Sequence, residues 1–140
     1  MILLNTNVLS EFMRVAPEPT VVTWLDDQPT DRIWICAINR AEIELGIALL
    51  PEGRKKQSLK LKADIMLDSD FADRCLPFDA AAASQYARIV AARTRIGKPI
   101  TVEDAQIASI ALVHRLTLAT RNVTDFRTIE DLEVIDPWQG

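Results

Sequence analysis

Histidine and cysteine are scarce in this 140-residue sequence, which contains one histidine and two cysteines. His114 falls late in a predicted helix, where a cation near the C-terminus suits the helix dipole, so we expect a structural role for it. A metal site built from several imidazoles, or a Ser-His catalytic pair, therefore has little support. Cys36 and Cys75 lie in apolar segments without the spacing of metal ligands, which predicts two buried free thiols.

Long apolar runs are also missing. The opening run covers only residues 1–4 and has no basic n-region, which argues against a signal peptide, and no stretch reaches the length that spans a bilayer. We therefore expect a cytoplasmic protein without a membrane partner. There are no repeats, low-complexity tracts or linkers, and the length suits a single domain covering residues 1–140.

The sequence has no excess of positive charge. Its formal net charge is −4, which argues against nucleic-acid binding through overall electrostatics. Positive charge is dense only in residues 54–62 and 93–98. Each stretch is either a solvated helix face or a local surface for a polyanion, and both interpretations stay open.

Apolar runs alternate with segments of helical periodicity along the chain. Strands are expected at residues 1–5, 31–38, 74–78, 116–122 and 132–138. Helices are expected at residues 7–13, 20–27, 39–50, 54–70, 79–96 and 101–115. This alternation predicts an α/β fold, with a parallel sheet and helices on both of its faces. In such folds, ligands bind beyond the carboxyl ends of the strands, where the strand order reverses.

Short polar side chains gather where such a site is expected. They are Asn5, Thr6 and Asn7, then Asn39 and Glu42, then Thr101 and Asp104, and finally Thr120, Arg121, Asn122 and Asp125. Taken alone, Glu42 and Asp104 have the spacing of helix-cap partners, and Asp125 is an ordinary loop residue. Together, four segments would bring oxygen ligands to one sheet edge. Such ligands suit Mg²⁺ or Mn²⁺, which can promote phosphodiester cleavage.

Several motifs, taken in order, resemble those of a PIN domain, most closely the VapC/FitB type of toxin ribonuclease. They are MILLNTNVLSE, the Ala41-Glu42 step, the Gly97/Pro99 break before TVEDAQIAS, LATRNVTDF and the closing Asp136-Pro137-Trp138. The resemblance covers essentially the whole chain. It implies a three-layer α/β/α sandwich around a mostly parallel five-stranded sheet. It also implies a homodimeric, Mg²⁺- or Mn²⁺-dependent endoribonuclease that is held by a cognate small antitoxin and meets DNA only through it.

The same resemblance assigns roles to the polar residues. It implies catalytic positions at Asn5, Glu42, Asp104 and Asp125, main metal ligands at Asn5 and Asp104, hydroxyl supports at Thr6 and Thr120, a helper at Asn122 and a phosphate contact at Arg121. Whether the fourth acid is Asp125, or Asn122 takes its role, stays open. The RNA-binding surface is unassigned, with Arg40, Arg93, Arg95 and residues 54–62 as candidates.

Asn5 departs from the family pattern, which ordinarily has an aspartate at this position. An amide is nearly isosteric with a carboxylate, but it is neutral and offers only one oxygen to a metal. We therefore expect weak metal binding and little activity in this chain. The substitution is either a deliberate inactivation of a toxic protein or natural degeneration, and the sequence is compatible with both.

Two other functions compete with the nuclease hypothesis. The chain could be a non-catalytic module that binds an antitoxin in an apolar groove, unless the same residues only form the core. The candidate groove residues are Val8, Leu9, Phe12, Val15, Trp24 and Leu25. A phosphatase or phosphotransferase with a strand-end D-x-D motif is the other alternative. It has less support, because no lysine is suitably placed near the fourth strand and Glu42 would have no role.

Overall fold

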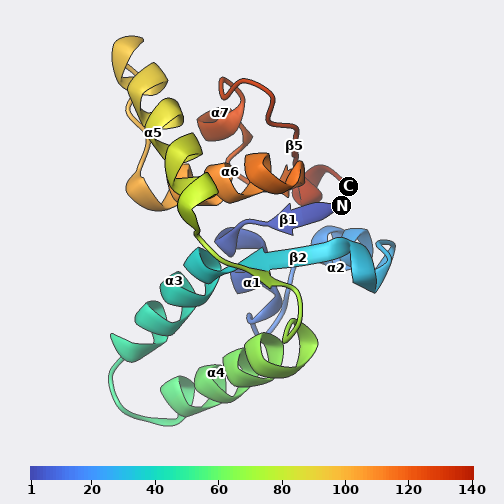
Figure 1. Cartoon of the computed structure of the whole chain (residues 1–140). Helices are drawn as coiled ribbons and strands as arrows, with labels where there is room; N and C mark the ends of the chain where they lie inside the picture. Colours follow the sequence, from blue (N-terminus) through green and yellow to red (C-terminus); the bar gives the residue numbers. More distant parts are fainter.

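A five-stranded sheet forms the centre of the computed structural model, which describes residues 1–140 (Figure 1). The strands are β1 (Ile2–Leu4), β2 (Ile33–Cys36), β3 (Cys75–Leu76), β4 (Thr117–Ala119) and β5 (Val134–Ile135). Their order across the sheet is β3-β2-β1-β4-β5, and every neighbouring pair is parallel. The predicted α/β class is confirmed, with a sheet that is entirely parallel.

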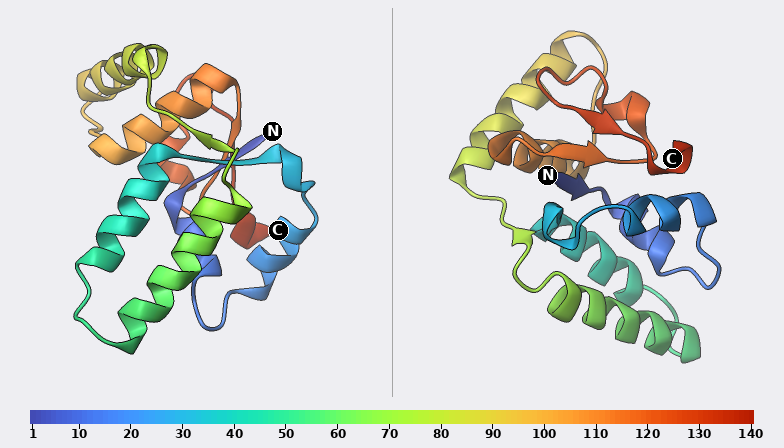
Figure 2. Two further views of the ribbon diagram at one scale, coloured as in Figure 1. Left: turned by 60° about the horizontal axis from the view of Figure 1, so that its bottom comes forward. Right: turned by 90° about the vertical axis from the view of Figure 1, so that its right-hand side faces the viewer.

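Helices cover both faces of the sheet, as two further views show (Figure 2). One face carries α1 (Thr6–Phe12), α2 (Pro19–Asp26), α3 (Ala37–Ala48) and α4 (Arg54–Ile65). The other carries α5 (Ala80–Arg95), α6 (Val102–His114) and α7 (Val123–Phe126). Three short turns complete the fold: η1 (Thr30–Arg32), η2 (Met66–Asp70) and η3 (Pro137–Gln139). None of the helices combines the length and the hydropathy that crossing a membrane requires.

Successive residues of the central strands point into two separate cores. In β1, Leu4 packs with α1–α4 and Leu3 packs with α5–α7, and neither side chain is exposed to solvent. In β4, Ala119 and Leu118 divide in the same way. Because these strands are buried on both faces, their sequences are continuous apolar runs rather than alternating ones. The two cores separate three layers, as the resemblance to a PIN domain implied.

Several element boundaries differ from the predicted ones. The edge strands β3 and β5 have only two residues each, because only two residues of each are paired with a neighbouring strand. Residues 54–70 do not form one regular helix, since α4 ends at Ile65 and continues into the π-type turn η2. Helix α3 begins at Ala37, two residues earlier than predicted. Asn39 therefore lies within its first turn instead of capping it.

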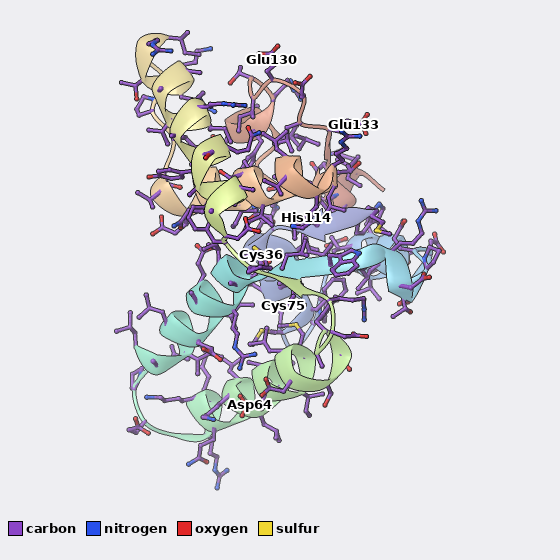
Figure 3. All side chains as sticks on the ribbon, viewed as in Figure 1. Cys36, Asp64, Cys75, His114, Glu130 and Glu133 are labelled. Carbon is purple, nitrogen blue, oxygen red and sulfur yellow. The ribbon has the colours of Figure 1, made fainter.

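The two cysteines, both labelled in Figure 3, have different environments. Cys36 is buried as predicted, and burial raises the pKa of its thiol to about 12. The prediction for Cys75 is wrong, because its side chain is exposed on the edge strand β3, which has a neighbouring strand on one side only. His114 lies in the last turn of α6, where its position suits the helix dipole.

Arg93 in the last turn of α5 is buried, with 8% of its side chain exposed, and it forms no ion pair. Its Nε donates to the carbonyl oxygen of Lys98 at 2.7 Å, and its Nη1 donates to that of Asp125 at 2.7 Å. The side chain thus ties the loop before α6 to the end of α7. Arg93 is therefore a structural clamp, and its assignment to a candidate RNA-binding surface is wrong.

We predict that Arg93→Met lowers the free energy of unfolding by about 3 kcal/mol, because the backbone carbonyl groups of Lys98 and Asp125 lose charge-assisted hydrogen bonds. Urea unfolding followed by circular dichroism measures this change. The exposed Arg95 on the same helix provides the matched control, and Arg95→Met should change stability by less than about 0.5 kcal/mol. Equal, small effects of the two substitutions would contradict the clamp.

Candidate functional site

The strand order reverses between β1 and β4, and a cleft of about 460 Å³ lies at their carboxyl ends. The backbone N–H of Asn5 donates to the carbonyl of Ala119 at 2.8 Å, which joins the two strand ends. The lining is mostly polar and comes from α1, α3, α6, the loop after β4 and η3. It consists of Asn5, Thr6, Asn7, Ser10, Glu11, Arg14, Glu42, Asp104, Arg121, Asn122 and Trp138.

Asn5 lies at the bottom of this cleft and is 4% exposed. It is the N-cap of α1, and its Oδ1 accepts the backbone N–H of Thr6 at 2.8 Å. Its Nδ2 donates to Oγ1 of Thr120 at 2.8 Å. Both arms of the neutral amide are therefore hydrogen-bonded, which a buried polar group requires.

Thr120 is fully buried beneath the cleft, and three donors converge on its hydroxyl oxygen. They are Nδ2 of Asn5 at 2.8 Å, Nδ2 of Asn7 at 3.3 Å and the backbone N–H of Asn122 at 3.1 Å. A hydroxyl has two lone pairs and one proton, and none of these contacts uses the proton. A carboxylate at position 5 would accept that proton together with the N–H of Thr6. The surroundings of Asn5 therefore suit an aspartate better than an amide.

Thr6 connects two residues from other parts of the chain. Its hydroxyl donates to Oε1 of Glu42 at 2.8 Å and accepts a hydrogen bond from Nδ2 of Asn39 at 3.0 Å. Asn39 is fully buried, and its Oδ1 accepts the backbone N–H of Cys36 at 2.7 Å. Asn39 thus supports Thr6, and Thr6 orients the carboxylate of Glu42 toward the cleft.

Asp104 faces Glu42 from the other layer of the fold. It lies in the first turn of α6, which Thr101 caps by accepting the backbone N–H of Asp104 at 3.2 Å, as the sequence spacing predicted. Burial raises the pKa of Asp104, and the negative charge of Asp125 raises it further. Burial likewise raises the pKa of Glu42, with a further increase from the charge of Asp104. The cleft therefore holds carboxylates close enough to repel one another.

Asn122 and Asp125 occupy different places relative to this acidic pair. Asn122 lines the cleft. Asp125 is exposed on α7 and lies outside the lining, although its charge acts on Asp104. The structure thus brings Asn5, Thr6, Glu42, Asp104, Arg121 and Asn122 to one cleft, with Thr120 beneath it.

Comparisons with known proteins agree with this architecture. The family model described as the PIN domain matches residues 2–132. This chain belongs to the PIN domain family. It is 42% identical over 138 residues to Toxin FitB of Neisseria gonorrhoeae, with 99% of each chain covered, and 34% identical over 139 residues to VapC ribonuclease Y4jK of Sinorhizobium fredii, again with 99% of each covered. In the solved structure of FitAB bound to an IR36 DNA fragment, a chain superposes with a TM-score of 0.90 and 41% identity, covering 99% of this chain and 96% of that one.

Glu11 and Arg14 of this PIN domain were missed as members of the site. Glu11 is 5% exposed, and hydrogen bonds from the backbone of Glu18 and from Arg14 lower its pKa. Nη1 of Arg14 lies 2.9 Å and 3.2 Å from its two oxygens. A signal was present in the sequence, because Asn7 and Glu11 are four residues apart and share one face of α1, and Arg14 follows Glu11 by three residues, just after the end of the helix.

The side-chain atoms of the PIN-domain cleft that could bind a metal ion are oxygen atoms, which are suitable ligands for a hard divalent cation. They come from the carboxylates of Glu42 and Asp104 and the amide oxygen of Asn5. No group of three His, Cys, Asp or Glu side chains is arranged to hold a metal ion. The residues therefore fit such an ion only in part, and an aspartate at position 5 would supply a further carboxylate beside Glu42 and Asp104, since the carboxylate of Glu11 is paired with Arg14.

An apolar groove of about 920 Å³ adjoins the cleft and is lined by residues of α1, α3 and α4. Its apolar lining includes Met13, Ile43, Ile47, Leu50 and Leu59, and its charged lining includes Arg14, Arg54, Lys55 and Lys62. The residues proposed from the sequence do not line one common groove, and Phe12 and Leu25 lie along a separate, smaller groove of about 300 Å³. Val8 and Leu9 are 0% and 1% exposed and belong to the core, because they face the sheet from α1. Of the proposed residues, only Val15 lines the larger groove.

The raised pKa values of Glu42 and Asp104 predict a pH dependence of stability. The folded protein holds these protons more tightly than the unfolded chain, so stability is lost as pH rises from about 4 through the raised folded-state values. Glu42→Gln removes one repelling charge and should increase the free energy of unfolding at pH 7, but not at pH 4. Glu44→Gln, at an exposed position of α3, is the control and should have little effect. Urea titrations at both pH values measure the difference, and equal effects at both would refute the repulsion.

Proposed function

We propose that this PIN domain is the toxin of a toxin–antitoxin pair and a metal-dependent endoribonuclease whose activity is weakened by Asn5. One observation carries the proposal. The N–H of Thr6 donates to Asn5, and the hydroxyl of Thr120, which accepts from the Asn5 amide here, has a proton that a carboxylate at this position would accept; both groups lie beside the acids Glu42 and Asp104. The relatives named as a toxin and as a VapC ribonuclease support the same activity.

In this proposal, Asn5 and Asp104 hold Mg²⁺ or Mn²⁺ together with Glu42. When bound, the ion supplies an activated water and stabilises negative charge on the phosphodiester oxygens. Thr6 orients Glu42, and Asn39 in turn orients Thr6. The amide of Asn5 provides no negative charge, and its single oxygen is already engaged by the N–H of Thr6. Weak metal affinity is the expected result.

A phosphotransferase of the D-x-D type has less support. Such chemistry would need the side chain of the second motif residue to be free in the cleft. The amide of Asn7 lines the cleft, but it is engaged, because it donates to the hydroxyl of Thr120 and accepts the backbone N–H of Arg121. No lysine lines the cleft. Glu42 and its hydrogen bond from Thr6 would have no purpose in that reaction.

We predict that Asn5→Asp raises Mn²⁺-dependent cleavage of single-stranded and transfer RNA at least about 100-fold, because even residues that only orient metal ligands commonly contribute 10- to 100-fold. Gel-resolved cleavage with Mn²⁺ and with EDTA measures the gain.

Two control variants separate the metal site from a general charge effect. Asn7→Asp adds the same charge to the same cleft and should not restore cleavage. The double variant Asn5→Asp/Asp104→Asn should be inactive again. A folded Asn5→Asp protein that binds no Mn²⁺ and cuts no RNA would rule out the nuclease function.

We further propose that a cognate small antitoxin docks in the apolar groove beside the cleft. The apolar and basic lining favours a segment that carries apolar and acidic side chains. The FitAB structure was determined with DNA, which agrees with DNA contact made through the antitoxin. This binding role would persist in a chain with weak catalysis. Homodimerisation stays a prediction from the resemblance, and a cytoplasmic location stays a prediction from the sequence.

Gly46 offers a direct test of the groove. It lies in the groove wall on α3, and a Cβ added to it would meet no atom within 4 Å. Gly46→Met should therefore fill the groove without distorting the helix, while improving its helix propensity by up to about 1 kcal/mol.

We predict that Gly46→Met weakens binding of the co-expressed antitoxin at least about tenfold, because filling a docking pocket removes well-packed contacts. Isothermal titration calorimetry on the separated components measures the affinity. Ala48→Met, at an exposed position of α3 outside the groove, should bind normally. Unchanged affinity in both variants would place the antitoxin elsewhere.

A further inference from the structure

Two cations line the cleft, and they differ in how they are engaged. The guanidinium of Arg14 is held by the carboxylate of Glu11 at 2.9 Å. Arg121 takes part in no ion pair, and its only hydrogen bond as a donor comes from its backbone N–H, to Asn7 at 3.4 Å. All the side-chain N–H groups of Arg121 therefore remain available to a ligand.

One direction of the Arg121 side chain is nevertheless favoured, because its guanidinium lies over an aromatic ring. Its Cζ lies 5.0 Å from the ring centroid of Trp138. Such a cation–π contact contributes about 0.5–1 kcal/mol at exposed sites. It engages one face of the planar group and leaves the N–H edge free, and that edge matches the geometry of a phosphate.

Trp138 is itself held firmly by the turn η3. Its backbone N–H donates to Oδ1 of Asp136 at 2.9 Å, and its ring packs against the core formed with α1–α4. Pro137 is buried, and η3 contacts α2, as the left-hand view of Figure 2 shows. The backbone N–H of Thr120 donates to the carbonyl of Ile135 at 2.9 Å, which keeps this turn beside Arg121.

We propose that Trp138 is a positioning residue that holds Arg121 as the phosphate-binding cation of the cleft. The proposal rests on the proposed function and names how the RNA strand is held. The carboxylates of Glu42 and Asp104 repel a phosphodiester. An RNA strand that enters the cleft therefore needs a positive charge from another part of the cleft lining. Arg121 provides it from the loop after β4, and Trp138 keeps it from turning into solvent.

The present chain is suited to a binding experiment, because its expected weak cleavage leaves the RNA intact. The probe is a fluorescently labelled, unstructured single-stranded RNA of about 20 nucleotides, titrated in Mg²⁺ at several salt concentrations and read by anisotropy. The variants are Arg121→Met, Arg121→Lys, Trp138→Leu and Trp138→Phe, together with the double variant Trp138→Leu/Arg121→Met. Arg127→Met, an exposed arginine outside the cleft lining, is the matched control.

We expect Arg121→Met to weaken RNA binding about tenfold and to reduce the slope of log affinity against log salt by about 0.7, the value for one phosphate contact on a single strand. Trp138→Leu should weaken binding about two- to fivefold, which corresponds to the loss of a contact of about 0.5–1 kcal/mol, and should reduce the slope in the same direction. Trp138→Phe should retain most of the affinity, and Arg121→Lys should be weaker than the parent, because it keeps the charge but loses the planar fork. The control should bind as the parent does.

The double variant decides whether Trp138 acts through Arg121. If it does, the double variant should bind no more weakly than Arg121→Met alone. Additive losses, or Trp138→Leu weakening binding without changing the salt slope, would overturn the proposal, as would unchanged binding by Arg121→Met.

If the parent and Asn5→Asp neither bind nor cut RNA, this inference and the proposed function both fail. Intact RNA binding without cleavage by Asn5→Asp removes only the nuclease function.

Discussion

The contact between the ends of β1 and β4 is the constraint on which the site depends. The backbone of Asn5 bonds to Ala119, and its side chain then meets the hydroxyl of Thr120. Because the strand order reverses at this pair, α1 leaves on one face of the sheet and α7 on the other. Side chains from both outer layers can therefore reach one cleft, Glu42 from α3 and Asp104 from α6. No single layer could supply both acids.

Because the side chain of Asn5 is neutral, it adds no charge repulsion to the folded protein when no metal ion is bound. Burial raises the pKa values of Glu42 and Asp104, and neighbouring carboxylates raise them further, Asp104 at Glu42 and Asp125 at Asp104. A carboxylate at the almost fully buried position 5 would add to this repulsion unless a cation compensated it. Asn5 therefore stands at a position where stability without metal and affinity for metal have opposite requirements.

Much of the fold could be predicted because its signals are local. The runs MILL and LTLA are apolar throughout since both faces of the central strands are buried, and Thr101 has the spacing of a helix cap. The contact partners of individual side chains were harder to predict. Asn39 contacts Thr6, 33 residues away in sequence, so local spacing suggested a cap instead.

The charge and polarity of a sequence stretch also did not predict whether an individual side chain is buried. Arg93 lies in a basic stretch, yet its side chain is buried and donates to the backbone carbonyls of the nearby Lys98 and the distant Asp125. Cys75 lies in an apolar segment, yet it is exposed because β3 is at the edge of the sheet. For the site, residue types and strand ends indicated the cleft. The cation–π pair of Arg121 and Trp138 depends on the packing of η3, which no sequence spacing encodes.

The apolar groove and the polar cleft share four side chains: Thr6, Ser10, Arg14 and Glu42. A molecule in either one therefore touches atoms that also serve the other, and the two binding equilibria are thermodynamically linked. Linkage is reciprocal, so an inhibitor that lowers the affinity for a substrate is itself released by that substrate to the same degree. In such an arrangement, a higher concentration of substrate raises the concentration of inhibitor that is needed to keep the protein inhibited. This coupling requires no conformational change.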